Sequence, residues 1–440
     1  MALDVRIFET ISPSRFISFT IPNPISPLQL LRVAVLDSPL HSTLSSPRVA
    51  VTLVPKHREA DWIFSTESGH LQLLLNLPDI SRLILIGDDP DGGTDFPAVY
   101  HRPIPEDSND SERLELRVKP LVVALSPKTL TRDEIDDVPF LIYEDDVVSS
   151  VELEKSVGPF VGEMVIEDVE IEIDDGVREF RRRLRFKRMP NLVQSEIKIV
   201  TRSTDSSNSK SLPSLTRTEF TPDLTELVHP YLAPMVASLS LIGSSHMDKS
   251  RPKALCIGVG GGGLLSFLRL HLGFEVTGVE IDPEVLRVAR HHFGLEESFA
   301  HVHVEDGIEF LKRFSSTCDG ENTKFDALMV DLDSTDPIHG VSAPPVDFVA
   351  RDVLLAARAV LVHSGVFVIN VIPPNKTFYQ ELKDEFRQVF ADLYEIDVGN
   401  GENFVLIATA APRDRKNNSF TRENLTPDVL VKYIDAIQKI

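Results

Sequence analysis

The sequence has few of the features that mark secreted, membrane-spanning or nucleic-acid-binding proteins. Two cysteines in 440 residues are too few for a disulfide framework, so we expect a reducing, cytoplasmic environment. No apolar run reaches the roughly 18 residues that a transmembrane helix needs, and the amino-terminal residues do not read as a signal peptide. Basic residues number 45 against 67 acidic ones, and the net charge of −22 disfavours non-specific binding to nucleic acid or to an anionic membrane.

Enough hydrophobic sequence is present for cores of ordinary size, and the length suggests two or three domains. Hydrophobic residues make up 42% and charged residues 25%, as in soluble globular proteins. Short β-branched runs bounded by proline, glycine, serine and aspartate predict strands at residues 15–21, 31–36, 48–54, 83–86, 114–125 and 162–173. We divide the chain into a β-rich N-terminal region (1–200), a flexible linker or loop (201–217), a cofactor-binding domain (218–412) and a helical tail (413–440).

One segment of the β-rich region carries a basic residue at every second position. Residues 180–187 predict a strand that carries Arg181, Arg183, Arg185 and Lys187 on one face, and residues 192–200 predict its hairpin partner. Two interpretations are open. The arginines form either a solvated basic face or a face that binds an acidic partner or the acidic loops of the chain itself.

The most informative stretch is residues 254–282, which predicts a strand, a glycine turn, a helix and a second strand. Five glycines between positions 258 and 263 let the backbone turn sharply and approach a ligand, because no Cβ stands in the way. The helix expected over 264–272 offers free N–H groups and a positive dipole end to an anionic group. Glu280 ends the second strand about 20 positions later, where an acidic side chain accepts hydrogen bonds from ribose hydroxyls. The pattern predicts a nucleoside-cofactor site, and it fits both NAD and S-adenosylmethionine.

Strands and helices alternate over the rest of the domain, as in a parallel sheet with helices on both faces. We expect helices at 224–241, 283–292, 308–314, 347–361 and 378–390, and strands at 300–304, 325–330 and 366–371. The last two strands, 393–398 and 404–409, are too close in sequence for a helical crossover and predict an antiparallel hairpin. A terminal hairpin is typical of S-adenosylmethionine-dependent methyltransferases, so we expect an α/β, Rossmann-like methyltransferase fold.

Acidic residues end three successive strands of this domain, and the carboxyl ends of parallel strands line the ligand crevice of such a sheet. Glu280 is expected to hold the ribose, and Asp306 to accept a hydrogen bond from the adenine amino group. Asp331 is expected to face the reacting group. Together with Asp333 and Asp336 it makes a negative mouth that attracts a protonated amine.

Several segments of the domain match a known family. They include GVGGGG (258–263), VEID (279–282), EDG (305–307) and DLDSTDP (331–337), and the match continues through residues 191–196, 283–288, 293–294, 344–345, 348–349 and 365–370. These segments resemble the spermidine synthase superfamily, and more closely the C-terminal domain of the methyltransferase-like protein 13 family. The resemblance covers roughly residues 180–412. It implies an S-adenosylmethionine-dependent methyltransferase of elongation factor 1-alpha that acts on lysine or on the N-terminal α-amine.

Departures from the spermidine synthases favour methyl transfer over aminopropyl transfer. Asp331 and Asp336 are separated by four residues, so only Asp333 and Asp336 keep the Asp-x-x-Asp spacing of those synthases. Two alternatives remain: an aminopropyltransferase that uses decarboxylated S-adenosylmethionine, and a non-catalytic scaffold that has kept the cofactor fold. Among acceptors, an α-amine has an ordinary pKa near 8 and a lysine one near 10.4, so the α-amine is the easier nucleophile.

The predicted site has a catalytic part and a cofactor part, and no metal is expected. The catalytic residues are Asp331, Asp333 and Asp336. The residues expected to bind the cofactor are Gly258, Gly260, Gly261, Gly263, Glu280, Ile281, Asp306, Gly307 and Asp331. The expected partner is a protein substrate, with elongation factor 1-alpha implied by the resemblance, and neither nucleic acid nor a membrane is expected to bind. The sequence leaves open whether the chain forms a homo-oligomer and what residues 1–180 do.

Overall fold

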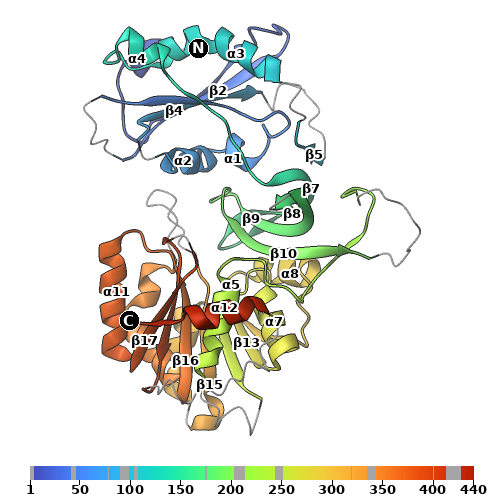
Figure 1. Ribbon diagram of the computed structural model, residues 1–440, viewed down its shortest axis with the longest axis vertical. Helices are drawn as coiled ribbons and strands as arrows, with labels where there is room; N and C mark the ends of the chain where they lie inside the picture. Colours follow the sequence, from blue (N-terminus) through green and yellow to red (C-terminus); the bar gives the residue numbers. More distant parts are fainter. Residues whose placement is uncertain are drawn as a thin grey trace.

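The structure is a computed structural model of the chain. It describes residues 4–40, 46–77, 79–89, 99–103, 108–173, 176–202, 214–242, 251–318, 320–333, 343–399, 401–412 and 428–440. Within these residues the strands form three sheets that follow one another along the chain (Figure 1). The first sheet lies at the amino-terminal end of the molecule, the third carries the glycine turn, and the second lies between them.

The first sheet is mixed and has the strand order β1-β2-β4-β3-β6. Its strands are β1 (Phe16–Pro22), β2 (Leu30–Asp37), β3 (Val49–Leu53), β4 (Arg82–Asp88) and β6 (Phe140–Leu141). The helices of this region are η1 (Val5–Glu9), α1 (Trp62–Ser65), α2 (Glu67–Leu75), α3 (Ser108–Leu125) and α4 (Arg132–Asp136). Buried side chains of η1 and α3 pack on one face of the sheet, and those of α1 and α2 pack on the other. The four strands expected between residues 15 and 86 are confirmed.

The strand expected over residues 114–125 is wrong, because this segment belongs to helix α3. Its valines favoured a strand in the sequence. Val118, Val122 and Leu125 are nevertheless spaced as on one face of a helix, and all three are buried against the first sheet. Packing of this apolar stripe therefore outweighs the local strand preference.

The second sheet is antiparallel and has the order β11-β10-β9-β8-β7-β5. Its strands are β5 (Val99–His101), β7 (Val147–Gly158), β8 (Gly162–Ile173), β9 (Val177–Phe186), β10 (Val193–Thr201) and β11 (Phe220–Pro222). Apolar side chains of β8, β9 and β10 share a core with helix α8 (Pro283–His292). Through this core the second sheet lies directly against the domain that carries the glycine turn.

The interpretation as a solvated basic face is wrong, because the arginines of β9 pair with acidic residues of the same chain. Arg181 and Arg183 each lie 2.6 Å from a carboxylate oxygen of Glu196 on β10. Arg185 lies 2.7 Å from Glu167 on β8 and is only 8% exposed. The second interpretation is correct in that the chain itself supplies the carboxylates, but Glu196 and Glu167 lie on the neighbouring strands and not in acidic loops.

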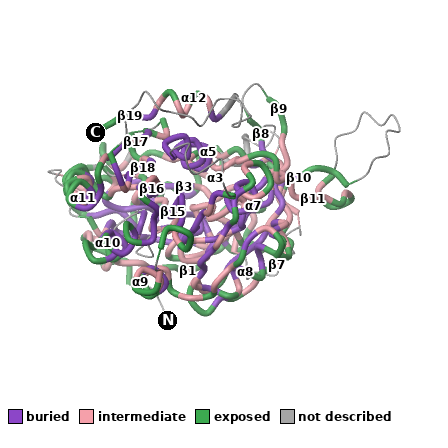
Figure 2. The backbone as a smooth tube through the Cα atoms, turned by 90° about the horizontal axis from the view of Figure 1, so that it is seen from below, coloured by how far each residue is buried: buried purple, intermediate pink, exposed green. Residues whose placement is uncertain are grey.

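The third sheet has the order β14-β13-β12-β15-β16-β18-β17-β19. Its strands are β12 (Lys253–Ile257), β13 (Glu275–Glu280), β14 (Ala300–Val304), β15 (Phe325–Val330), β16 (Leu361–Val371), β17 (Asp392–Asp397), β18 (Phe404–Thr409) and β19 (Gln438–Lys439). The first five are parallel neighbours, and β18 inserts antiparallel between β16 and β17. The parallel sheet and the terminal antiparallel hairpin are therefore confirmed, and the strands at its centre are buried (Figure 2).

Helices cover both faces of the third sheet. They are α5 (Leu232–Ala237), η4 (Ser238–Leu241), α7 (Gly263–Leu272), α8, α9 (Gly307–Thr317), η5 (Glu321–Thr323), η6 (Val346–Val349), α10 (Arg351–Ala359), α11 (Lys376–Val389) and α12 (Asp428–Ala436). One core contains side chains of α5, α7, α8 and α12, and the opposite core contains those of α9, α10 and α11.

Two expected helices are shorter in the structure than in the prediction. Residues 224–231 are not helical, so only α5 and η4 remain of the helix expected over 224–241. The helix expected over 347–361 is split into η6 and α10, and β16 already begins at Leu361. Among the described residues, no helix is both long enough and apolar enough to cross a membrane.

Candidate functional site

The glycine turn follows β12 at the carboxyl edge of the third sheet. Gly258 has a φ of +86°, and a Cβ added to it would lie 2.1 Å from the backbone oxygen of Asp331. Only glycine allows both the left-handed conformation and this close approach of two strand ends. Helix α7 begins at Gly263, directly after the turn, so its first N–H groups face the same edge of the sheet.

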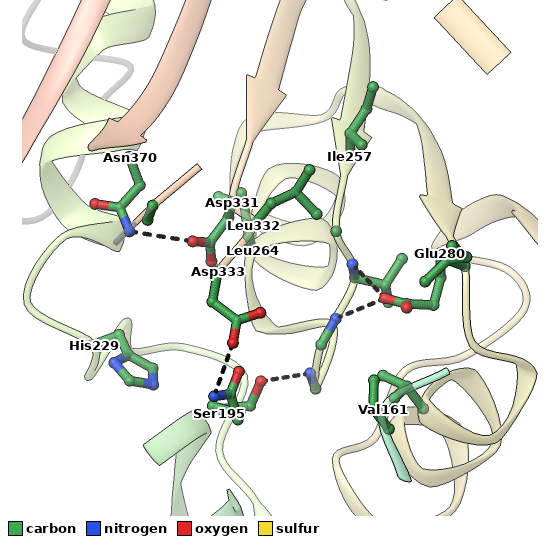
Figure 3. Close-up of a pocket in the computed structure, with 18 of the residues that line it drawn as sticks. Val161, Ser195, His229, Ile257, Leu264, Glu280, Asp331, Leu332, Asp333 and Asn370 are labelled. Atoms are coloured by element: carbon green, nitrogen blue, oxygen red, sulfur yellow. Dashed lines mark hydrogen bonds between the residues drawn. The ribbon is translucent and has the colours of Figure 1, made fainter. Parts of the chain in front are cut away.

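Glu280 ends β13 and braces the glycine turn. Its Oε2 atom accepts hydrogen bonds from the N–H groups of Val259 at 3.0 Å and Gly260 at 3.4 Å (Figure 3), and its Oε1 atom accepts one from Asp282 at 3.1 Å. Burial raises the pKa of this carboxyl group, while the backbone hydrogen bonds act in the opposite direction. A carboxylate oxygen can accept more than one hydrogen bond, so Glu280 can brace the turn and bind a ribose hydroxyl at the same time.

Asp306 and Gly307 lie at the start of α9, on the same edge of the sheet. Asp306 Oδ1 accepts hydrogen bonds from the N–H groups of Ile308 at 2.8 Å and Glu309 at 3.0 Å, so this side chain is the N-cap of α9. Asp306 is exposed and already engaged by the helix. A test of its expected contact with adenine must therefore preserve the cap, which asparagine does and alanine does not.

Asp331 follows β15, beside the glycine turn, and lies between two polar side chains from other elements. Asn370 Nδ2, from β16, donates to Asp331 Oδ1 at 3.3 Å (Figure 3), and the Tyr231 hydroxyl group also hydrogen-bonds the carboxyl group. Burial raises the pKa of Asp331 to about 6, although these two hydrogen bonds act in the opposite direction. Asn370 Oδ1 is buried and has no hydrogen-bond partner among the described residues, so it can accept a hydrogen bond from a ligand.

Asp333 is held by the second sheet. Arg188 Nη2, from the loop between β9 and β10, lies 3.2 Å from each carboxylate oxygen, and Gln194 Nε2, from β10, donates to Oδ2 at 3.3 Å. Both oxygens of this predicted catalytic residue are thus occupied by donors of the chain itself. Asp336, the third predicted catalytic residue, lies outside the described part of the chain.

One cavity of about 680 Å³ joins the glycine turn to Asp331 and Asp333. The residues expected to bind the cofactor all line it: Gly258, Gly260, Gly261, Gly263, Glu280, Ile281, Asp306, Gly307 and Asp331. The second sheet closes the opposite side, where the Ser195 hydroxyl oxygen accepts a hydrogen bond from Gly261 N–H at 2.8 Å. A cavity of this volume accommodates a nucleoside cofactor together with a small acceptor group.

The turn between β7 and β8 is fixed to the same cavity. The N–H groups of Phe160 and Val161 donate to Asp282 Oδ2, each at 2.9 Å, and both side chains line the cavity. Asp282 is also the N-cap of α8. A single buried carboxylate therefore joins the second sheet to the cofactor side of the third.

Several polar residues of the cavity are absent from the predicted site, among them Asn370, Gln194, Ser195, Arg188, His229 and Tyr231. His229 Nε2 has no hydrogen-bond partner in the part of the chain that the structure describes, and burial lowers the pKa of the imidazole. The His229 and Tyr231 rings lie 5.2 Å apart. The run His229-Pro230-Tyr231 is the one sequence signal that could have identified the pair, since proline and two polar rings fit poorly in the helix expected there.

The residues around the glycine turn fit a nucleoside cofactor on structural grounds. The turn leaves room for a ligand against the backbone, the first N–H groups of α7 face the cavity edge, and the buried Glu280 carboxylate can accept ribose hydrogen bonds. The antiparallel insertion of β18 distinguishes this sheet from a plain dinucleotide-binding domain. The fold thus favours S-adenosylmethionine over NAD.

Comparisons with known proteins agree with this architecture. Residues 237–403 match the spermine/spermidine synthase domain family. The chain is 30% identical over 380 residues to the eEF1A lysine and N-terminal methyltransferase of Bos taurus, covering 82% of this chain and 50% of that protein. It is 28% identical over 400 residues to the Homo sapiens protein of that name, covering 87% of this chain and 54% of the relative. The chain therefore spans about half the length of these relatives.

One similar solved structure is that of human methyltransferase-like protein 13 in complex with SAH, which is 26% identical in sequence. The match covers 47% of this chain and 90% of the methyltransferase-like protein 13 chain, with a TM-score of 0.40. The family resemblance expected from the glycine turn and the acidic strand ends is confirmed by the domain match and the sequence relatives. This chain carries a spermine/spermidine synthase-like domain of the Rossmann-like methyltransferase fold, and over most of its length it is a relative of the eEF1A lysine and N-terminal methyltransferases.

Proposed function

We propose that this chain is an S-adenosylmethionine-dependent methyltransferase that acts on a protein amine, and that its acceptor is the N-terminal α-amine of elongation factor 1-alpha. The names of the relatives support methyl transfer to eEF1A, and they include both lysine and the N-terminus as acceptors. The observation that carries the proposal is the position of Asp331, which lies in one cavity with the glycine turn and beside Tyr231 and Asn370.

The proposed mechanism divides the cavity into two sides. S-adenosylmethionine would supply a methyl group on a sulfonium that is already reactive, so the protein has to align the amine and favour its neutral form. Glu280 and the glycine turn bind the nucleoside. Asp331 orients the amine and accepts its proton, and Asn370 Oδ1 accepts a second N–H hydrogen bond. Asp333 and the undescribed Asp336 remain proposed members of the acidic mouth.

The properties of Asp331 favour an α-amine over a lysine. Its pKa of about 6 lies about two units below that of an α-amine and more than four units below that of a lysine. Proton transfer to the carboxylate is therefore far less uphill from an α-ammonium group. Asp331 is a base of moderate strength, and it suits an N-terminal acceptor because an α-ammonium group is easier to deprotonate than a lysine.

The acceptor assignment is tested with two peptides that carry the N-terminal sequence of the acceptor. One has its α-amine blocked, and the other has its lysines replaced. We expect methyl transfer from labelled S-adenosylmethionine to the lysine-free peptide and at least tenfold less to the blocked one. Of the two kinds of amine, the α-amine has the pKa closer to that of Asp331. Mass spectrometry identifies the modified position. Transfer that survives the block and disappears without lysine would refute the α-amine assignment.

Replacing Glu280 with alanine is expected to weaken binding of S-adenosylmethionine by about 1.5–3 kcal/mol, because both the acceptor for the ribose hydroxyls and the brace of the turn are lost. Isothermal titration calorimetry measures the dissociation constant. Glu275→Ala changes an exposed glutamate on the same strand, so it serves as the control and should bind as the wild type does. Unchanged affinity in folded Glu280→Ala protein would mean that another residue holds the ribose.

Aminopropyl transfer is less compatible with this cavity. A diamine substrate needs a carboxylate whose charge is available to its second ammonium group, whereas the Arg188 guanidinium already pairs with Asp333 and Gln194 donates to it as well. Titration with S-adenosylmethionine, its decarboxylated form and NAD separates the alternatives. Preference for the decarboxylated form would favour the aminopropyltransferase, and binding of none would favour a non-catalytic scaffold.

We also propose the setting in which the enzyme works. Cys256 and Cys318 are both free, which supports a reducing, cytoplasmic location. The division at residues 200, 217 and 412 remains our proposal, with residues 218–412 as the methyltransferase domain, although β11 belongs to the second sheet, and α12 and β19 pack with the third. The acidic net charge of −22 supports a protein acceptor in preference to nucleic acid.

A further inference from the structure

The β9–β10 loop, residues 187–192, lies between the first sheet region and the cavity. On its outer side it contacts helix α2. Ser68 Oγ donates a hydrogen bond to the backbone oxygen of Lys187 at 2.9 Å, and Gln72 Oε1 accepts one from the N–H group of Asn191 at 3.0 Å. Ser68 and Gln72 are four residues apart and so lie on the same face of α2. Helix α2 therefore holds the loop near both of its ends.

Arg185 ties the same loop to the start of α1. Its Nη1 atom lies 3.0 Å from Asp61 Oδ1 and 3.0 Å from the backbone oxygen of Pro190. Asp61 also caps α1 through the N–H group of Ile63. Arg185 and Gln72 are 8% and 7% exposed, so these contacts are shielded from water. A buried polar contact of this kind is costly to break, because the groups left behind lose their partners.

On its inner side the same loop forms part of the cavity wall. Arg188 contacts both oxygens of Asp333, and its guanidinium group stacks 4.9 Å from the centre of the Phe186 ring. The strand that follows the loop supplies Gln194 to Asp333 and Ser195 to the glycine turn. The contacts of α2 outside and those of the cavity inside are thus close along the backbone: Lys187 precedes Arg188 directly, and Asn191 lies three positions from both Arg188 and Gln194.

We propose that α2 is a positioning element for the acceptor side of the cavity, with Ser68 and Gln72 as its positioning residues. By fixing the β9–β10 loop, they hold Arg188 against Asp333 and so set the position of Asp333 relative to Asp331. This gives the amino-terminal region a role in the reaction without any contact with cofactor or acceptor. A small displacement of such a wall is costly, since transfer depends on close alignment of the reacting atoms. The expected effect on the rate rests on the proposed methyl transfer, whereas the expected effect on the position of the loop does not.

The test compares Gln72→Leu, which removes the acceptor of the Asn191 N–H group, with Gln72→Glu, which keeps an acceptor oxygen there. In the full chain without ligands, hydrogen exchange at the Asn191 amide should be at least tenfold faster in Gln72→Leu and close to wild type in Gln72→Glu. With the lysine-free peptide, kcat/KM should fall about tenfold in Gln72→Leu and recover in Gln72→Glu. The dissociation constant of S-adenosylmethionine should stay within twofold of wild type in both.

Gln380→Leu is the matched control, because it makes the same chemical change on the exposed face of α11. It should alter neither hydrogen exchange at Asn191 nor methyl transfer. Unchanged exchange at Asn191 in Gln72→Leu would overturn the proposal. So would a loss of cofactor affinity that matches the loss of transfer, since that indicates general damage. If the wild-type chain transfers no methyl group, the proposed function fails, while the exchange measurement still decides whether α2 holds the loop.

Discussion

Replacing Asp331 with asparagine is expected to lower the turnover number for methyl transfer by roughly 10²-fold or more. Asparagine keeps the size of the side chain but cannot accept the proton that leaves the amine. The contacts of the nucleoside with Glu280 and the glycine turn are untouched, so the dissociation constant of S-adenosylmethionine should stay within a few-fold of wild type. Single-turnover kinetics with the lysine-free peptide, together with calorimetric titration of the cofactor, measure the two effects separately.

Asp352→Asn provides the control for this change. Asp352 is an exposed carboxylate of α10 that pairs with Lys312 at 2.7 Å, away from the cavity. Its replacement should leave both turnover and cofactor binding unchanged. If Asp331→Asn turns over as fast as Asp352→Asn, Asp331 is neither the orienting group nor the proton acceptor, and the acidic mouth must act through another residue.

The pH dependence of the wild type should report the same carboxyl group. Burial raises the pKa of Asp331 to about 6, so below that pH the side chain is protonated and cannot accept a proton. We expect kcat/KM to fall as the pH drops through about 6, and we expect this decrease to be absent in Asp331→Asn. For stability the sign is opposite. The raised pKa means that the contribution of Asp331 to the free energy of unfolding is fully present below about pH 4 and is lost as the pH rises through about 6.

The cofactor side of the site could be predicted from the sequence because its parts are close together along the chain. The glycines, Glu280 and Asp306 each lie at or just after the end of a short strand, and the parallel order of β12, β13 and β14 brings these ends to one edge. Local sequence patterns are enough to predict such a site when strands and helices simply alternate along the chain. The contacts of Glu280 with the turn itself required the structure, since nothing in the sequence says which of its neighbours a carboxylate braces.

The acceptor side could be predicted only in part. Asp331 follows from its strand, but its partner Tyr231 precedes the third sheet by some 20 residues of chain, and Arg188 comes from a different sheet. Such pairs are created by tertiary packing, and a single sequence carries no periodicity that relates them. The arginines of β9 illustrate the same limit, because their alternation predicts a strand face but not the carboxylates that neutralise it.

Gly258→Ala is expected to abolish measurable binding of S-adenosylmethionine and to lower the free energy of unfolding by about 2 kcal/mol or more. The left-handed conformation at Gly258 alone costs an alanine roughly 1–2 kcal/mol. The added Cβ would also lie 2.1 Å from the backbone oxygen of Asp331, and backbone cannot rotate away as a side chain can. Relief of this contact must separate the ends of β12 and β15, which moves the glycine turn away from Asp331.

Two other glycines of the same turn make the result specific. Gly263 has no neighbouring atom within 4 Å of an added Cβ and begins α7, so Gly263→Ala should bind the cofactor normally and change stability by less than about 1 kcal/mol. At Gly260 the φ is +52° and the obstructing atom is Ser195 Oγ, the mobile end of a side chain, so Gly260→Ala should show an intermediate loss. Calorimetry and thermal unfolding of the three variants give the ranking. Equal behaviour of Gly258→Ala and Gly263→Ala would mean that the close approach of the turn to Asp331 does not control cofactor binding.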